Sequence, residues 1–306
     1  NYVDGIPYVA GLTTTDITGD VVMKAAFNPD NKEFDIEKYI AAAKDYKTVI
    51  FAGGLASCLE GEQLEVSAPG FDGGDRTTLS LPDVQKQVIK ALHDAGKRVI
   101  LVNFSGSAMA FKDESKWCDA IVQAWYLGQE GGKAIADVLY GDVNPSGKLP
   151  VTFYKSTAQL PEFTDYSMEN RTYRYFKGEP MYAFGYGLSY TKFEYSDLQI
   201  KPGNGKDVLQ TVTCTVKNTG DRDGQEIVQL YIRDMVASIA QAPILLKAFE
   251  RVELKKGESK TITFNLGKRE LSMYNAQLEE VVEPGDFKVM IGASSDDIRL
   301  EGMFKL

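Results

Sequence analysis

Histidine and cysteine are scarce in this chain of 306 residues, which has one histidine, His93, and three cysteines, Cys58, Cys118 and Cys214. Most transition-metal sites need several such ligands, so the sequence predicts no metal site. The cysteines are also too few and too widely spaced for a disulfide framework. A Ser-His-Asp triad is disfavoured, because His93 falls in a helical pattern over residues 82–95, away from the end of any predicted strand.

Positive charge and long apolar runs are also in short supply. Lys and Arg number 34 against 43 Asp and Glu, a formal net charge of -9, and no basic patch is present that would bind a nucleic-acid backbone. No run approaches the roughly 20 apolar residues that a membrane helix needs. The longest, such as residues 99–102, have the length of a strand. We therefore expect a neutral substrate, no nucleic acid and no membrane partner.

The overall composition is that of an ordinary globular protein, with 43% hydrophobic and 25% charged residues. A chain of this length can form about two domains, each with its own core. The first residue is Asn1, and no charged start followed by an apolar segment and a small-residue cleavage site is visible. We therefore expect that processing or fragmentation has removed the natural N-terminus.

Residues 35–155 alternate between apolar runs of strand length and patterns of helical spacing, which is typical of a parallel sheet covered by helices. Asp35 can cap the first helix, Pro82 fits a first helical turn, and Gly96 and Gly141 can end helices. Ligands of an open α/β sheet usually lie beyond the carboxyl ends of its strands. We expect strands over residues 48–52, 98–104, 120–126 and 151–154, and helices over residues 36–43, 82–95 and 134–139.

From about residue 208 the pattern changes to short alternating strands separated by turn residues, which predicts a small antiparallel sandwich. The preceding stretch is rich in Tyr, Phe and Gly, and we expect a linker packed on the first domain, because so many rings cannot stay solvated at low cost. The predicted fold class is thus an open, mostly parallel α/β sheet between helices, followed by an all-β sandwich. The expected ranges are 1–160 for the first domain, its N-terminal completeness left open, 161–207 for the linker and 208–306 for the sandwich, with strands over residues 209–217, 218–224, 227–232, 260–265 and 286–292.

Two carboxylates, Glu60 and Glu62, follow the strand over residues 48–52 on a glycine-rich loop that ends in Asp75 and Arg76. Side chains two apart in an extended segment point to the same side and can share one site. Crowding of two carboxylates raises the pKa of one of them, which suits a proton donor for glycosidic bond cleavage. Charge alone equally fits a solvated acidic loop. Arg76 either clamps a substrate hydroxyl or orients the loop through a salt bridge with Asp75.

Three other segments carry weaker signals. Residues 103–107 (NFSGS) resemble a nucleophile loop but lack the G-x-S-x-G pattern and a histidine partner, so a tight turn after a strand is favoured. Residues 128–132 (GQEGG) lack a Walker lysine-serine pair and the spaced Rossmann glycines, so we expect a turn at a helix start and no cofactor. Trp117 and Trp125 could stack on sugar rings, but a place in the core is favoured.

The stretch LEGE (59–62) followed by GGDRT (73–77) most resembles the bacterial β-xylosidases of glycoside hydrolase family 3. Four long motifs resemble the C-terminal part of the same family. They read AWYLGQEGGKAIADVLYGDVNPSGKLPVTFY (124–154), RTYRYFKGEPMYAFGYGLSYTKFEY (171–195), AFERVELKKGESKTITFNL (248–266) and EPGDFKVMIGASSDDIRL (283–300). The resemblance covers most of the chain from about residue 49. It implies an α/β sandwich domain followed by a fibronectin type III-like domain, which agrees with the two-part pattern above.

The resemblance implies a retaining exo-glycosidase whose general acid/base is a glutamate in a segment such as E-x-E-x-x-D-R. Here Glu60-Gly61-Glu62 reaches Asp75-Arg76 only after an insertion. We expect Glu62 to be the acid/base, with Glu60 as the close alternative, and Glu60, Asp75 and Arg76 to contact substrate. The expected substrate is terminal β-1,4-linked xylose of xylo-oligosaccharides or an aryl glycoside. The alternatives are a β-glucosidase, an α-L-arabinofuranosidase and a non-catalytic carbohydrate-binding module.

The family's aspartate nucleophile comes from a TIM-like barrel that precedes the α/β domain, and nothing before Glu60 resembles it. A barrel needs about 250 residues. The resemblance therefore implies a partner barrel domain outside this chain, and we expect the chain to be inactive by itself. The residues do not indicate a compartment, whereas the family resemblance implies a periplasmic or secreted enzyme.

Overall fold

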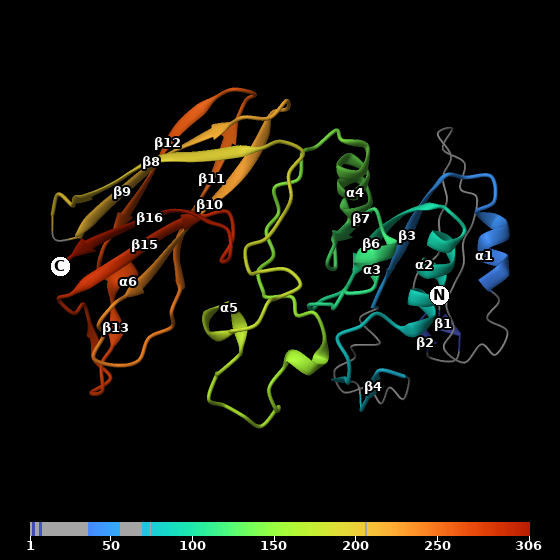
Figure 1. The fold of residues 1–306 in the computed structure, drawn as a ribbon, viewed down its shortest axis with the longest axis horizontal. Coiled ribbons are helices and arrows are strands. Elements are labelled where there is room, and N and C mark those ends of the chain that lie inside the picture. The colour runs from blue at the N-terminus through green and yellow to red at the C-terminus, as the bar shows by residue number, and fades with distance from the viewer. Residues whose placement is uncertain (1, 4–5, 8–35, 56–68, 74, 206) are drawn as a thin grey trace. The chain divides into compact units, whose positions relative to one another are not determined.

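A computed structural model describes residues 2–3, 6–7, 36–55, 69–73, 75–205 and 207–306. Its contacts divide the chain into two compact units (Figure 1). The domain boundaries that we expect from the sequence, at residues 160 and 207, stay a prediction. The first unit comprises Asn1–Ile135, Phe153–Leu160 and Glu179–Met181, and the second comprises Ala136–Thr152, Pro161–Gly178 and Tyr182–Leu306.

The first unit is built on a three-stranded parallel sheet. Its order is β3-β6-β7, with Thr48 opposite Arg98 and Ile100 opposite Ala120. The strands are rich in β-branched and other apolar residues, and Val49, Val99 and Leu101 are fully buried, as expected for a sheet that is covered on its faces. The α/β fold class predicted for this part is confirmed. The strands are β3 (Thr48–Gly54), β6 (Arg98–Phe104) and β7 (Ala120–Gln123).

Helix α2 (Asp83–Asp94) packs against β3 and β6 and lies beside α1 (Ile36–Ala42) (Figure 1). It begins directly after Pro82, where the missing amide hydrogen of proline has no cost, and ends before Gly96, whose φ of +74° suits glycine. Both boundaries were predicted from these residues. Helices α3 (Glu114–Trp117) and α4 (Gly131–Tyr140) follow later in the chain. No helix in the described ranges is long and apolar enough to cross a membrane.

The expected fourth strand over residues 151–154 is wrong. Only an isolated bridge occurs there, with the amide of Met181 donating to the carbonyl of Phe153 at 2.7 Å. The apolar side chain that suggested a strand is instead a core ring: Phe153 is 1% exposed and packs against Phe111 and Trp125. The strand expected over residues 120–126 also ends early, at Gln123, because Trp125 has a φ of +58° that breaks the extended backbone.

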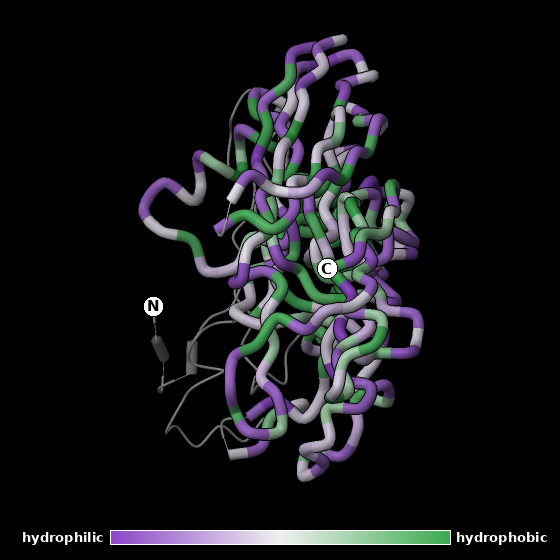
Figure 2. The backbone as a smooth tube through the Cα atoms, turned by 90° about the vertical axis from the view of Figure 1, so that its left-hand side faces the viewer, coloured by the Kyte–Doolittle hydropathy of each residue, from purple (hydrophilic) through white to green (hydrophobic). Residues whose placement is uncertain are grey.

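The second unit contains an antiparallel sandwich of two sheets, in the orders β12-β9-β8 and β11-β10-β15-β16. Alternate residues of these strands face a common apolar core, as in the pattern of β12, where Ile262, Phe264 and Leu266 are buried between exposed neighbours. Hydrophobic and hydrophilic residues alternate along the chain in Figure 2. The predicted all-β sandwich is confirmed. Its strands are β8 (Phe193–Pro202), β9 (Gln210–Asn218), β10 (Gly224–Asp234), β11 (Leu245–Leu254), β12 (Ser259–Leu266), β15 (Asp286–Gly292) and β16 (Ile298–Lys305).

The strand expected over residues 218–224 is wrong, since β9 ends at Asn218, β10 begins at Gly224 and residues 219–223 form the turn between them. The buried side chain of Asn218 shapes the turn: its Nδ2 donates to Arg222 O at 2.7 Å and to Leu254 O at 3.1 Å, and its Oδ1 accepts from Gly220 N at 3.1 Å. Asparagine favours such local bonds over a strand ladder. The sequence reasoning also missed β8, β11 and β16.

Strand β8 lies inside the stretch expected to be a linker, and it pairs along β9. Nearby aromatic residues of the same stretch also belong to the second unit. Tyr173 stacks on Phe184 at 4.2 Å, and its hydroxyl accepts a hydrogen bond from Leu246 N of β11. Tyr173 and Phe184 are therefore half-buried in the second unit, whereas Phe163 and Tyr166 of the same stretch are 86% and 84% exposed. The expectation that the rings of this stretch are packed away from water holds for only part of them.

The short elements are β1 (Tyr2–Val3), β2 (Ile6–Pro7), β4 (Phe71–Asp72), β5 (Asp75–Arg76), η1 (Thr157–Gln159), α5 (Thr172–Tyr175), α6 (Lys268–Leu271), β13 (Met273–Tyr274) and β14 (Glu280–Val281).

Candidate active site

The two predicted acid/base carboxylates, Glu60 and Glu62, lie outside the described residues, in the gap over 56–68. Their roles stay a prediction. The structure does describe the chain on both sides of that gap. Leu55 ends the described part after β3, and the chain is described again from Pro69.

The carboxyl end of β3 is held by the side chain of Gln85, which comes from the first turn of α2. Gly54 N donates to Gln85 Oε1 and Gln85 Nε2 donates to Gly54 O, both at 2.8 Å. Gln85 is 3% exposed, so this pair of bonds is shielded from water. Gly54 has a φ of +124°, and a Cβ there would lie 2.0 Å from the carbonyl oxygen of Phe104. Only glycine therefore lets the backbone leave the sheet at this point.

Both backbone polar groups of Leu55 make hydrogen bonds. Its amide donates to Phe104 O at 2.6 Å, and its carbonyl accepts from the hydroxyl of Tyr126 at 2.9 Å. Three parts of the fold thus meet at the exit of β3: the end of β6, the chain after β7 and the start of α2. This is the edge of the sheet at which ligands of open α/β folds bind.

Asp75 and Arg76 form β5, which pairs with β4 in a two-residue hairpin. Arg76 Nη2 donates to Ala108 O at 2.9 Å, and Nη1 donates to Met109 Sδ at 2.7 Å. The guanidinium therefore contacts the loop that follows β6, and no ion pair between Arg76 and Asp75 occurs among the described contacts. A hollow of about 200 Å³ adjoins it, lined by residues 69–71, Arg76, Thr78 and residues 80–83. Contact of Asp75 or Arg76 with a substrate stays a prediction.

The loop after β6, residues 105–110, is held by buried polar side chains. Asn103 Nδ2 donates to Ser105 Oγ at 2.8 Å and to Gln123 Oε1 at 2.7 Å, and Ser105 Oγ donates to Ser107 O at 2.9 Å. Asn103 and Ser105 are 0% exposed. In the described part of the chain Ser105 has no histidine partner, so the tight turn favoured for residues 103–107 agrees with this geometry.

The other candidates from the sequence take no part in this edge. His93 is exposed in the last turn of α2. Burial raises the pKa of Cys118 to about 12, with a further contribution from the charges of Glu114 and Asp119, so this thiol is not a nucleophile at neutral pH. Trp125 meets Phe153 edge-on at 6.1 Å in the first unit. No cluster of three potential metal ligands occurs in the ranges that the structure describes.

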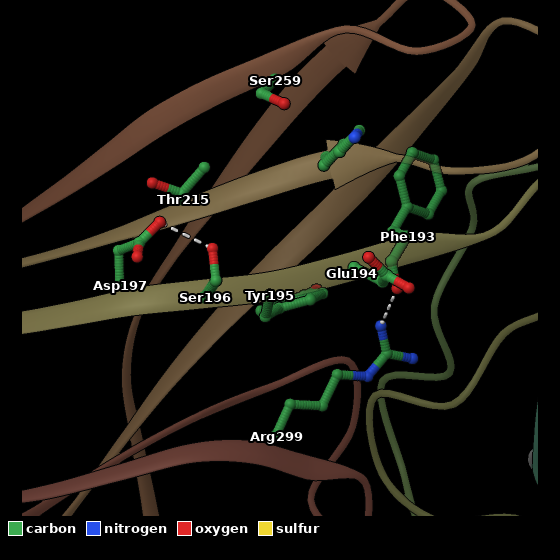
Figure 3. A pocket seen from close by; sticks show the side chains of 9 residues that line it. Phe193, Glu194, Tyr195, Ser196, Asp197, Thr215, Ser259 and Arg299 are labelled. Atoms are coloured by element: carbon green, nitrogen blue, oxygen red, sulfur yellow. Dashed lines mark hydrogen bonds between the residues drawn. The ribbon is translucent and has the colours of Figure 1, made fainter.

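A second hollow, of about 470 Å³, lies on the sandwich around the edge strand β8 (Figure 3). Arg299 Nη1 donates to Phe193 O at 2.8 Å, and its guanidinium lies 4.7 Å from the centroid of the Tyr195 ring. A bulge in β8 places Asp197 at a φ of +55° beside Ser196. Charges and bulges of this kind protect an edge strand from pairing with other chains. The hollow contains none of the predicted site residues.

Sequence reasoning missed Gln85 and Tyr126. A signal for Gln85 was present, because it lies on the same helical face as Val88, Ile89 and Leu92 and is the one polar residue in that buried stripe. A polar side chain in such a position needs a fixed partner. Tyr126 carried no comparable signal, since its partner Leu55 is 71 residues away along the chain.

Comparison with known proteins agrees with this fold. Residues 6–190 match the glycosyl hydrolase family 3 C-terminal domain, and residues 226–295 match the fibronectin type III-like domain. A xylan 1,4-β-xylosidase of Xylanibacter ruminicola is 48% identical over 86% of this chain and 30% of its own length. A periplasmic β-glucosidase of Salmonella typhimurium is 36% identical over 91% of the chain and 37% of its own length.

Solved structures show the same similarity. The β-D-glucoside glucohydrolase of Trichoderma reesei superimposes with a TM-score of 0.78 at 32% identity, over 89% of this chain and 42% of that protein. The chain thus spans about a third of the length of the curated relatives that it matches. The resemblance inferred from the four motifs is confirmed. The chain belongs to glycosyl hydrolase family 3, as its C-terminal α/β domain followed by a fibronectin type III-like domain.

Proposed function

We propose that this chain is the acid/base-bearing portion of a retaining exo-acting β-glycosidase, with Glu62 as the general acid/base and Glu60 as the alternative. The observation that carries the proposal is the family match over residues 6–190. The position of both glutamates supports it, since they follow β3 by a few residues, beyond the carboxyl end of a parallel strand.

In this proposal Glu62 acts twice. As a neutral acid it donates its proton to the glycosidic oxygen while an aspartate attacks the anomeric carbon and forms a covalent glycosyl-enzyme. As a carboxylate it then removes a proton from the water that releases the sugar. A retaining mechanism needs the two carboxyl groups about 5–5.5 Å apart.

We propose terminal β-1,4-linked xylose as the substrate, because the xylosidase relative is 48% identical whereas the periplasmic β-glucosidase is 36% identical. A β-glucosidase is the second candidate, and a thermostable β-glucosidase of Acetivibrio thermocellus at 39% identity favours it. Both activities use the same acid/base chemistry. An α-L-arabinofuranosidase stays the third candidate, from the sequence.

We further propose that the aspartate nucleophile belongs to a TIM-like barrel domain that is not part of this chain. The relatives are about three times as long as the region that matches, which leaves room for such a domain. The chain alone would then be inactive. A periplasmic or secreted location is proposed on the basis of the periplasmic relative.

The test is an assay of the full-length gene product on a panel of aryl β-xylosides, β-glucosides and α-L-arabinofuranosides. The proposal expects the highest kcat/KM on the xyloside, and Glu62→Gln should slow substrates with poor leaving groups far more than activated ones, because only the former need the acid. A larger selective effect of Glu60→Gln would move the role to Glu60. Turnover by the 306-residue chain alone would overturn the proposal that the nucleophile lies outside this chain. No turnover by the full-length product would overturn the proposed enzyme activity and favour a binding module.

A further inference from the structure

The loop that leads into α5, residues 161–171, exposes large apolar side chains to solvent. Phe163 is 86% exposed, Tyr166 is 84% exposed and Met168 is 42% exposed. The loop contains no strand or helix of its own (Figure 1). Single exposed apolar residues are common on protein surfaces, whereas several of them close together are typical of a surface that binds another protein surface.

The side chain of Arg171 holds this loop in one shape. Its Nη2 donates to Glu162 O at 2.6 Å and to Asp165 O at 3.0 Å, and its Nε donates to Asp165 O at 3.2 Å. The carboxylate of Asp165 in turn accepts from Ser167 N at 2.9 Å. The exposed rings therefore belong to a turn whose backbone is fixed by hydrogen bonds, and the turn presents them to solvent in a defined arrangement.

The backbone of the same segment is strained. Met168, Asn170 and Thr172 have φ values of +66°, +57° and +57°. Asparagine tolerates this left-handed region, but it is unfavourable for a β-branched residue such as threonine. Residues of this kind persist where surrounding contacts fix them, and they occur most often at binding and switching surfaces. The strain thus agrees with a surface that a partner covers.

Two cations without a counter-charge lie beside Tyr173, which follows the loop. The guanidinium of Arg174 lies 5.8 Å from the centroid of the Tyr173 ring, and the Tyr173 hydroxyl accepts from Leu246 N at 3.1 Å. Lys247 is the next residue of β11, and a bulge leaves it without a partner residue on β10. In the part of the chain that the structure describes, no carboxylate lies within ion-pair distance of either cation.

The surroundings of Lys247 favour the approach of a negative charge. Lys247 is half-buried, and burial lowers the pKa of its ammonium group, opposed by the charge of Glu270 and reinforced by that of Arg174. The carboxylate of Glu270 is bound elsewhere, since its Oε2 accepts from Gly267 N at 2.9 Å. A partly desolvated cation is unfavourable unless a counter-charge comes close to it. A partner with a carboxylate on its surface would supply that charge.

We infer that the loop over residues 161–171, together with Arg174 and Lys247, is a docking surface for the barrel domain of the full-length protein. The inference rests on the proposed function, because the barrel is proposed there. All of these residues belong to the second unit. The lengths of the relatives favour this occupant: the chain spans 30% of the xylosidase and 37% of the periplasmic β-glucosidase, so most of such a protein is available to cover the surface.

The docked face of the barrel is expected to combine two features. An apolar depression would receive the rings of Phe163 and Tyr166, because aromatic side chains contribute most at the centre of an interface. At least one Asp or Glu would lie opposite Arg174 and Lys247, because charges across an interface are arranged to be complementary.

Hydrogen–deuterium exchange of the full-length product and of the 306-residue chain tests the surface. Backbone amides of residues 163–170 are expected to exchange at least about tenfold more slowly in the full-length product, because docking excludes water and suppresses local opening. The turn over residues 275–279 is the matched control: it also exposes an apolar side chain, Leu278 at 82%, with a φ of +62°, and should exchange equally in both proteins. Equal exchange of residues 163–170 in the two proteins would overturn the inference.

Substitutions distinguish docking from a role inside the second unit. Phe163→Ser combined with Tyr166→Ser should return the exchange of residues 167–170 in the full-length product to the rate of the 306-residue chain, and should leave that chain unchanged. Lys247→Met should act in the same direction and less strongly. Leu278→Ser is the control and should change neither protein. Equally faster exchange in both proteins would indicate a structural role within the second unit and overturn the inference.

Other occupants give different results. Slower exchange of residues 163–170 in the 306-residue chain on addition of xylotetraose would indicate a glycan site, and slower exchange at higher protein concentration would indicate a second copy of the chain. Either result would overturn the inference. The measurement does not depend on turnover. If the full-length product protects residues 163–170 but cleaves no glycoside, the proposed activity fails and the docking surface stands.

Discussion

Single polar residues inside this protein are tolerated where their partners are fixed. In the second unit, Lys148 Nζ lies 3.0 Å from Glu226 Oε1, and the two side chains are only 14% and 5% exposed. The same Lys148 donates to Gly187 O, and the same Glu226 oxygen accepts from the amide of Ile227. The pair thus joins residues far apart in the sequence through charge-assisted bonds.

Removing one member of this pair should be costly. Lys148→Met leaves Glu226 buried without its counter-charge, and such losses usually cost about 3–5 kcal/mol. We expect a clear fall in the free energy of unfolding, measured by urea titration. Lys177→Met is the control, because Lys177 and Glu169 are 73% and 61% exposed and pairs of this kind contribute at most about 1 kcal/mol. Equal effects of the two substitutions would contradict this account.

Glu114 gives a pH-dependent prediction. It is 1% exposed, its Oε1 has no hydrogen-bond partner in the described structure, and burial raises its pKa, partly opposed by backbone hydrogen bonds and by Lys86. A raised pKa in the folded state means that stability is fully present below the unfolded pKa of about 4.3 and is lost as pH rises through the folded pKa.

We therefore expect Glu114→Gln to melt at a higher temperature than the unsubstituted chain at pH 7 to 8, and the difference to shrink toward pH 4. Differential scanning calorimetry across this range measures it. Asp119→Asn is the control, because it lies on the same connection and its carboxylate is bound by Val99 N. A Glu114→Gln effect that is the same at every pH would show that its charge is not the cause.

Among the elements, α4 begins with two adjacent glycines in different surroundings. A Cβ at Gly131 would lie 2.5 Å from Leu127 Cβ, whereas a Cβ at Gly132 has nothing within 4 Å. Residues 128–132 were expected to form a turn at a helix start, and Gly131 N indeed donates to Gly128 O before the helix proceeds. The close approach of Leu127 thus explains one glycine only.

The two glycines should respond with opposite signs to alanine. Gly132→Ala is expected to stabilise the protein by about 0.5–1 kcal/mol, because alanine is the better helix former. Gly131→Ala is expected to destabilise it by about 1–3 kcal/mol, because Leu127 must move. Thermal unfolding of each variant measures both. Stabilisation by both substitutions would mean that the contact with Leu127 is easily relieved.

Helices and strands were predictable from the sequence where the residues that mark them lie close together along the chain. Helix α2 and strand β6 were predicted almost to the residue, because apolar spacing, Pro82 and Gly96 mark them within the sequence. The expected strand at residues 151–154 was wrong because apolar character alone does not distinguish a strand from a loop whose ring, Phe153, fills the core. Strand β8 was missed because its pairing with β9 is a tertiary contact.

At the scale of the whole molecule, the chain crosses repeatedly between its two units. Residues 136–152 and 161–178 belong with the sandwich, while residues 153–160 and 179–181 belong with the parallel sheet. Within the second unit, Asn144 shows how deeply the earlier segment is built in: its Nδ2 donates to Asp223 O, and its Oδ1 accepts from Tyr190 N. The second unit therefore includes segments that precede the strands of the sandwich in the sequence.

A shortened chain that starts at residue 208 should not unfold cooperatively. It lacks β8, which supplies Phe193 and Tyr195 to the core, as well as the pair of Tyr173 and Phe184. A chain that starts at residue 136 retains these elements and should show a cooperative transition. Circular dichroism on heating compares the two. Equal transition temperatures for both chains would show that the earlier segments add nothing to the sandwich.

The sequence by itself determined the order of the two folds, the boundaries of α2 and β6 and the resemblance to the family, because periodicity, capping residues and long motifs are all encoded within short stretches. Only the tertiary structure decided which polar groups hold the edge of the sheet. Gln85 binds Gly54 across 31 positions, and Arg76 binds Ala108 across 32. Such partners have no local signature, since the fold alone brings them within the roughly 3 Å that a hydrogen bond requires.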